Sequence, residues 1–199
     1  MNLSITSVLA RVPKGRHVPS IDMDPKQKRK ALSEASQRAT KIFKSQMSYF
    51  CTVLEETLGD IDFMLEAANV ISQPKIVKDH IVYDLTNVGV MLIGYNDDQL
   101  TLAVRVPSES PITAEEWSRL ALENVDINSN DLVWKTTDNG DGVHYTVIGN
   151  CPENGIYVFK LRDQLINAAY STLRSRGLLP STSDEDEDEL YDEDVFQCV

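Results

Sequence analysis

Apolar residues change their period along this chain of 199 residues, and the change limits the folds that the chain can adopt. Before Gly59 they recur at spacings of three and four, which is the period of one face of a helix. Beyond Pro74 they gather in short runs rich in β-branched and aromatic residues, which are typical of strands. The sequence therefore predicts the α+β class, in which helices pack on an antiparallel sheet.

The first predicted helix is long and amphipathic and covers residues 25–58. Asp24 can cap its free amides, and Pro25 suits the first helical position, where no amide hydrogen is needed. Gly59 predicts its end. Residues 1–24 show no period and predict an irregular basic arm, and a shorter helix is expected over 60–70. The apolar or small residues of the long helix lie at positions 32, 35, 39, 42, 43, 47, 50, 54 and 58, a face that needs a partner surface.

Residues 76–149 predict an antiparallel sheet with one inserted helix. Three strand-like runs separated by polar turns indicate a meander. Thr113 and Glu116 have the spacing of a capping box and predict the start of the inserted helix. Residues 139–142, with the sequence Asn-Gly-Asp-Gly, favour a hairpin between two further strands over a calcium loop. The expected strands are 76–85, 88–95, 100–106, 132–137 and 143–149, and the inserted helix is 112–124.

A last helix is predicted over residues 157–176, where apolar residues again follow a helical period and Gly177 indicates the end. The predicted order is therefore helix, three strands, helix, two strands and helix. The α+β domain then spans 25–177, and a tail spans 178–199.

Charge is distributed unevenly over the three parts of the chain, although the net value is −12. Residues 1–45 hold ten basic and three acidic residues, and residues 46–183 hold nine basic and nineteen acidic ones. Residues 184–199 hold nine acids and no base. An acidic body repels phosphate groups, so binding of nucleic acid would have to begin at the N-terminal arm.

The C-terminal tail is the most specific feature of the sequence. A run of six acids cannot bury apolar surface, so we expect disorder there. One interpretation is a solubilising tail. The other is an interaction tail that docks on a basic partner or mimics nucleic acid. The apolar residues among the acids favour docking. Tails of this kind resemble those of single-stranded DNA-binding proteins. The partner-binding candidates in the tail are Asp184, Glu185, Asp186, Glu187, Asp188, Glu189, Tyr191 and Phe196.

A basic cluster at the start of the long helix is the second candidate contact surface. Lys26, Lys28, Arg29 and Lys30 resemble a short nuclear-import or nucleic-acid patch. The alternative is a solvated first turn. Positive charge opposes the helix dipole at this end, and that cost indicates a use, such as pairing with the acidic tail.

No pattern in the sequence indicates bond-making chemistry, and we expect a protein that is not an enzyme and has no cofactor or metal. The three cysteines are scattered, which indicates free thiols in a reducing compartment, and a Cys51–His80 pair stays open. No phosphate-binding glycine loop occurs. No run of 18 apolar residues occurs either, so we expect no membrane-spanning helix. The expected location is the cytoplasm, with the nucleus as the alternative.

The order of elements and the acidic charge resemble the type III secretion chaperone fold and the related YbjN-type domains. The resemblance covers about residues 48–176. The meander 76–106, the helix 112–124, the hairpin 131–149 and the last helix carry it. It implies a homodimer that binds an extended segment of a client protein without ATP.

Two functional hypotheses follow. The first is a non-enzymatic protein-binding module, chaperone-like or an adaptor, that acts through the apolar helix face, the sheet surface and the acidic tail, as a homodimer formed through the helix 25–58 or the sheet. The second is a nucleic-acid accessory protein of viral or phage type. Its basic arm would bind phosphates, and its tail would be autoinhibitory or recruit partners.

Overall fold

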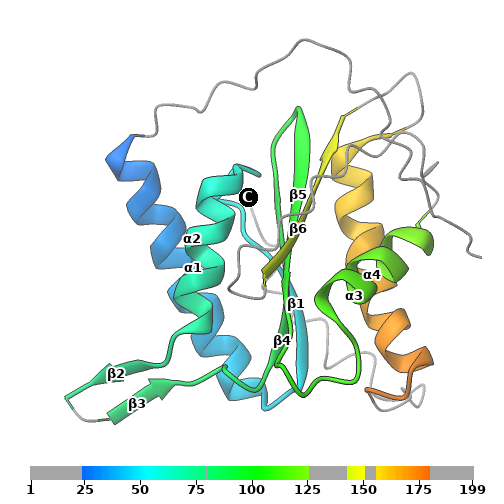
Figure 1. Cartoon of the computed structure of the whole chain (residues 1–199). Helices are drawn as coiled ribbons and strands as arrows, with labels where there is room; N and C mark the ends of the chain where they lie inside the picture. The colour runs from blue at the N-terminus through cyan, green and yellow to red at the C-terminus, as the bar shows by residue number, and fades with distance from the viewer. Residues whose placement is uncertain (1–23, 79, 126–142, 151–155, 180–199) are drawn as a thin grey trace, which may run out of the picture.

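The protein is a three-layer arrangement of helices and one central sheet, described by a computed structural model for residues 24–78, 80–125, 143–150 and 156–179. Two helices cover each face of the sheet (Figure 1). The predicted α+β class is thereby confirmed. The helices are α1 (Pro25–Ser45) and α2 (Ile61–Ser72) on one face, and α3 (Ala114–Glu123) and α4 (Val158–Ser175) on the other.

The central sheet has the strand order β1-β4-β5-β6, and most of its pairs are antiparallel. β4 pairs with β5 and β5 with β6 in antiparallel fashion, whereas β1 runs parallel to β4 at the edge. A separate two-stranded hairpin, β2–β3, stands outside this sheet. The strands are β1 (Tyr49–Val53), β2 (Lys75–Val77), β3 (His80–Tyr83), β4 (Gly89–Tyr95), β5 (Gln99–Arg105) and β6 (Val143–Gly149).

The prediction that one helix covers residues 25–58 is wrong beyond Ser45. Gln46 adopts a left-handed conformation with a φ of 56°, its amide bonds back to Phe43, and the helix ends there. The following residues form β1, in which aromatic and β-branched side chains favour an extended backbone. Their spacing also fits a helix face, and parallel pairing with β4 decides between the two structures.

The predicted meander is partly wrong. Residues 76–85 do not add a strand to the central sheet but fold into the β2–β3 hairpin. The two strands that follow in the prediction are confirmed as β4 and β5, and the strand 143–149 is confirmed as β6. The predicted strand 132–137, the turn 139–142, the basic arm 1–23 and the tail 180–199 lie outside the described residues.

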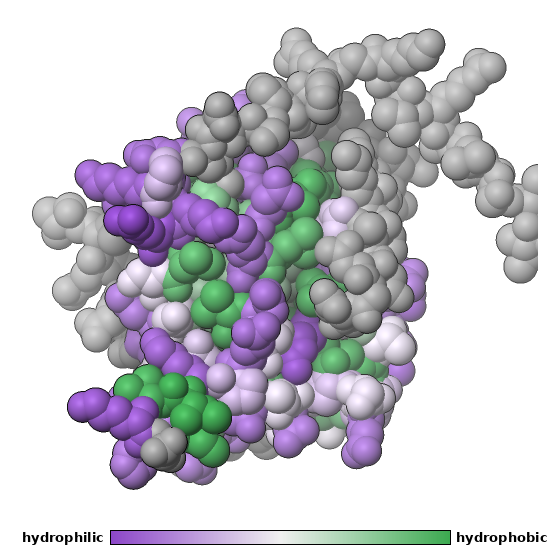
Figure 2. All heavy atoms as spheres, turned by 60° about the vertical axis from the view of Figure 1, so that its left-hand side comes forward, coloured by the Kyte–Doolittle hydropathy of each residue, from purple (hydrophilic) through white to green (hydrophobic). Residues whose placement is uncertain are grey.

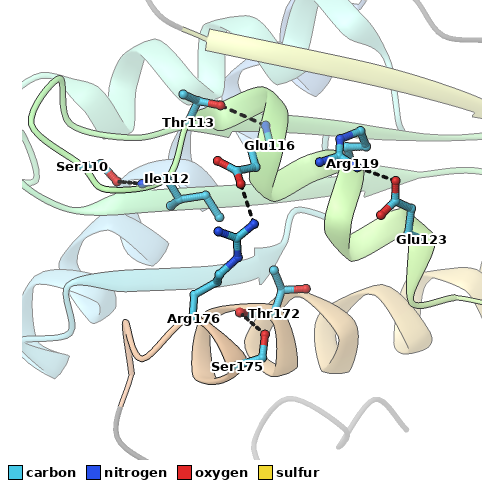
Figure 3. Close-up of polar contacts among 9 residues, drawn as sticks. All are labelled: Ser110, Ile112, Thr113, Glu116, Arg119, Glu123, Thr172, Ser175 and Arg176. Atoms are coloured by element: carbon cyan, nitrogen blue, oxygen red, sulfur yellow. Dashed lines mark hydrogen bonds and ion pairs between the residues drawn. The ribbon is translucent and has the colours of Figure 1, made fainter.

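The predicted helix starts are confirmed by their capping bonds. Asp24 accepts the amide hydrogen of Lys26, and Thr113 accepts that of Glu116. The carboxylate of Glu116 is bound 2.6 Å from the guanidinium of Arg176, so it ties α3 to the end of α4 (Figure 3). α4 agrees with the predicted helix 157–176 within a residue at each end.

The core on the α3/α4 face is built around Trp117, which is fully buried. The edge of the Tyr49 ring meets Trp117 at 5.7 Å between ring centroids. The indole nitrogen donates to the carbonyl of Ala169 in α4 at 3.2 Å. This face of the sheet is therefore closed by packing and is not a binding surface.

The apolar face of α1 is also part of the core. Its four buried residues pack on α2 and on the base of the hairpin, and each is at most 1% exposed. These residues therefore have their partner within the same chain, and the homodimer through the helix 25–58 or the sheet stays a prediction. The four residues are Ala31, Ala35, Ala39 and Ile42.

Candidate docking surface

The β2–β3 hairpin projects from the α1/α2 layer, away from the body of the molecule (Figure 1). Figure 2 shows a hydrophobic patch on this projection with hydrophilic residues around it. The side chain of Ile76 is 62% exposed, that of Ile81 is 61% exposed and that of Val77 is 46% exposed. These three side chains form the apolar tip of the hairpin.

The register of the hairpin places the two isoleucines side by side. Ile76 is the cross-strand partner of Ile81, and Val77 is the partner of His80. Side chains of directly opposed residues lie on one face of a β-ribbon, so Ile76 and Ile81 form a continuous aliphatic strip. Lys78 turns the chain with a φ of 50°.

The base of the hairpin, unlike its tip, is anchored in the core. Tyr83 is 2% exposed and Leu85 is fully buried. The Tyr83 hydroxyl donates to the carbonyl of Val70 at the end of α2, at 3.3 Å. A two-stranded ribbon is only marginally stable alone, so the buried base is what holds the projecting tip in a fixed position on the body.

Two lysines flank the apolar tip. Lys75 and Lys78 are both exposed. Neither lysine forms an ion pair with another described residue. The tip therefore combines an aliphatic strip with two lysines that pair with no described residue, in a protein whose net charge is −12.

A second exposed apolar group lies at the start of α4. Tyr157 is 52% exposed and Phe159 is 49% exposed. Phe159 stacks edge-on against Tyr95 at 5.3 Å, and the guanidinium of Arg162 lies 4.9 Å from the centre of the Tyr95 ring. Arg162 also pairs with Asp163 at 2.7 Å. Because these side chains already contact one another, this group is a weaker docking candidate than the hairpin.

The predicted basic cluster is not one free patch. Lys28 pairs with Glu66 at 2.5 Å, and Lys30 lies 3.6 Å from Glu56. Lys26 and Arg29 are exposed, and neither pairs with a described residue. Since two of the four cations already neutralise acids of this chain, the cluster offers less positive charge to phosphates than the sequence indicates.

The tail candidates lie outside the described residues. These are Asp184, Glu185, Asp186, Glu187, Asp188, Glu189, Tyr191 and Phe196, and their role stays a prediction.

The Cys51–His80 pair that the sequence left open does not form. Cys51 lies in the core on the α3/α4 face, whereas His80 lies on the exposed hairpin. Burial raises the pKa of the Cys51 thiol to about 12, so the reactive thiolate is absent at neutral pH. This cysteine is a core residue.

Three buried polar side chains on the α3/α4 side of the sheet are, like Cys51, inaccessible to a ligand. Ser118 and Thr146 are fully buried and His144 is 7% exposed, and the side chains of all three have an unbonded polar atom in the described structure. Burial lowers the pKa of His144, against a smaller opposite effect of Glu115.

On the opposite face, a hollow between α2 and the sheet measures about 10 Å³, which is room for about one water molecule.

The outer edge of β1 is covered by a side chain. Ser48 and Leu54 bond to β4, so the alternate residue Cys51 turns its backbone groups away from the sheet. The Tyr170 hydroxyl accepts from the Cys51 amide at 3.1 Å and donates to the Cys51 carbonyl at 3.3 Å. This cover protects the edge against strand addition.

No family model matches the chain, and no curated protein matches it. The resemblance to type III secretion chaperones and YbjN-type domains therefore stays a prediction. Within the described ranges, no group of three or more metal-binding side chains occurs and no helix is long and apolar enough to span a membrane.

Sequence reasoning missed the hairpin as a site, although a signal for it is present. Three polar residues, Lys78, Asp79 and His80, interrupt the apolar run 76–85. A short polar interruption between β-branched runs is typical of a hairpin turn. The signal is weak because the interruption contains neither the glycine nor the asparagine that tight turns favour.

Proposed function

We propose that this protein is a non-enzymatic binding module, an adaptor or chaperone-like protein, that docks on another protein through the β2–β3 hairpin. The observation that carries the proposal is the exposure of Ile76, Val77 and Ile81 on a projecting ribbon. Soluble proteins seldom hold such apolar groups in water without a binding use. The free thiol of Cys51 supports a reducing compartment such as the cytoplasm.

The energetic argument concerns the apolar tip. Fully burying an aliphatic side chain contributes about 1.5–3 kcal/mol, and these three are roughly half exposed. Covering the Ile76–Ile81 strip, which lies on one face of the ribbon, would then contribute on the order of 2 kcal/mol to binding, or roughly thirtyfold in affinity. The open edges of the ribbon can add backbone hydrogen bonds to an extended partner segment.

The sheet surface and the apolar helix face, which the sequence also suggested for binding, are less available to a partner than the hairpin. Helices cover both faces of the sheet, and Tyr170 covers the edge of β1. The apolar face of α1 is core. The hairpin thus takes the place of these surfaces in the proposal.

The test is a double substitution, Ile76→Thr with Ile81→Thr. Threonine keeps the β-branched shape and the strand propensity but removes the apolar strip. The matched control is Phe159→Gln, which removes an exposed apolar side chain from the second group. Each protein, expressed at its native level in its own cells, is captured with its bound proteins, which are quantified by mass spectrometry.

We expect the double variant to lose bound proteins by tenfold or more, with the control unchanged. A bound set that is the same for the wild type and the double variant would rule out docking through the hairpin. Sedimentation velocity of the purified proteins then tests the homodimer. If a second copy is the partner, the wild type sediments as a dimer and the double variant as a monomer.

A further inference from the structure

We propose that the apolar tip of the hairpin is occupied, in the absence of a partner, by the C-terminal segment 190–196 of this same protein. This inference rests on the proposed function, because it treats the hairpin as a docking surface and adds its regulation. Val195 and Phe196 would cover the Ile76–Ile81 strip, and the acids 192–194 would lie beside Lys75 and Lys78. The tail would then compete with the partner.

The chemistry of the two segments is complementary. The hairpin offers exposed aliphatic side chains bordered by two lysines that pair with no described residue. The segment has the sequence Leu-Tyr-Asp-Glu-Asp-Val-Phe, in which apolar pairs flank three acids. Burial of the apolar groups would supply most of the binding energy. Attraction between the charges would set the orientation and make the contact sensitive to salt.

Other cationic places in the described structure fit this segment less well. Lys28 and Lys30 already pair with acids of this chain. Lys26 and Arg29 are exposed, but Ala31, the hydrophobic residue that follows them in the described helix, is 1% exposed. The hairpin joins two lysines that pair with no described residue to exposed aliphatic surface, and the tail joins acids to apolar residues. The two segments therefore have opposite charges, and both have apolar side chains to bury.

The tail is long enough to reach the hairpin from the end of the described chain. From Leu179 to Val195 there are 16 residues, which span up to about 50 Å when extended. A domain of roughly 150 residues has a radius of gyration of about 15 Å, hence a width of about 40 Å. The path around the body is therefore within reach.

Tethering makes a weak contact sufficient. A flexible tether holds its end at an effective concentration on the order of 1 mM. A segment with a dissociation constant of about 1 mM would then occupy about half of the hairpins and weaken the binding of a partner about twofold. A tighter contact would weaken it in proportion.

The test uses the full chain and a native thiol. Cys198 lies two residues after Phe196, and a nitroxide attached to it reports which residues the tail approaches. Cys51 is buried with a raised pKa and does not react, and Cys151→Ser removes the remaining thiol. Isoleucine methyl groups are labelled for NMR. Ile76 and Ile81 report the contact, and Ile93, a β4 residue in the core on the α3/α4 face of the sheet, is the reference.

We expect the methyl signals of Ile76 and Ile81 to broaden more than that of Ile93. The excess should shrink with the double substitution Val195→Ser and Phe196→Ser, and also in 1 M salt. Equal broadening of all three methyl groups would overturn the proposal, as would a maximum at Ile166 in α4 instead. A mixture of spin-labelled and isotope-labelled molecules shows whether the supporting contact is made within one chain or between two.

The two proposals can fail separately. If the hairpin variant loses its bound proteins but the methyl signals show no approach of the tail, the regulatory proposal is wrong and the docking proposal stands. If the tail approaches the hairpin but the captured proteins do not change, docking through the hairpin is wrong. If both hold, the Val195→Ser and Phe196→Ser variant should bind the captured partner at least about twofold more tightly.

Discussion

Removal of the Tyr170 hydroxyl should destabilise the protein by uncovering the edge of β1. In the native structure this one group satisfies both the amide and the carbonyl of Cys51, at 3.1 and 3.3 Å. Cys51 is 5% exposed, so water cannot readily replace the hydroxyl. Tyr170→Phe keeps the ring and its packing and deletes only the oxygen atom.

The expected loss is about 2 kcal/mol, because leaving a buried backbone group without a partner costs about 1–3 kcal/mol. Urea unfolding followed by tryptophan fluorescence measures it. With an m-value of about 2 kcal/mol/M, the midpoint should fall by about 1 M while the m-value stays constant.

The matched control is Tyr157→Phe. Tyr157 is 52% exposed, and its hydroxyl makes no hydrogen bond to a described residue, so the change should stay within about 0.5 kcal/mol. If Tyr170→Phe lowers the midpoint no more than the control does, the hydroxyl does not protect the edge. The β1 edge would then return as a candidate surface for strand addition.

Three further predictions concern the interior. Gly94→Ala should cost about 1–3 kcal/mol in urea unfolding, because its Cβ would lie 2.5 Å from the Met64 sulfur and from the Thr57 hydroxyl; a neutral result would mean that the turn before α2 yields easily. Glu34→Ala should cost about 1–3 kcal/mol by the same assay, since its carboxylate accepts two amides of the loop after β1 at 2.9 and 3.0 Å; no loss would show that water caps that loop equally well. Burial lowers the pKa of His144 below 6.5, so the folded state binds its proton less readily than the unfolded state. The free energy of unfolding should therefore decrease as the pH drops below about 6.5, and it should decrease less in the His144→Gln variant. Identical pH profiles of the two proteins would show that His144 does not cause the decrease.

The sequence alone determined where the helices begin and which strands pair locally. Asp24 and Thr113 each cap a helix as their positions indicate. β4 and β5 were predictable because a short turn joins them and their residues are apolar and β-branched. These features depend on contacts within a few residues, so the local pattern contains the needed information.

Only the tertiary structure decided what residues 46–58 and 76–85 become. β1 exists because β4, about 40 residues later, pairs with it, and no local period distinguishes that outcome from a longer helix. The hairpin stands apart from the central sheet because Tyr83 and Leu85 pack under α1 and α2, which leaves Ile76 and Ile81 in water. Exposure depends on which distant surfaces meet, and residue spacing alone does not encode that.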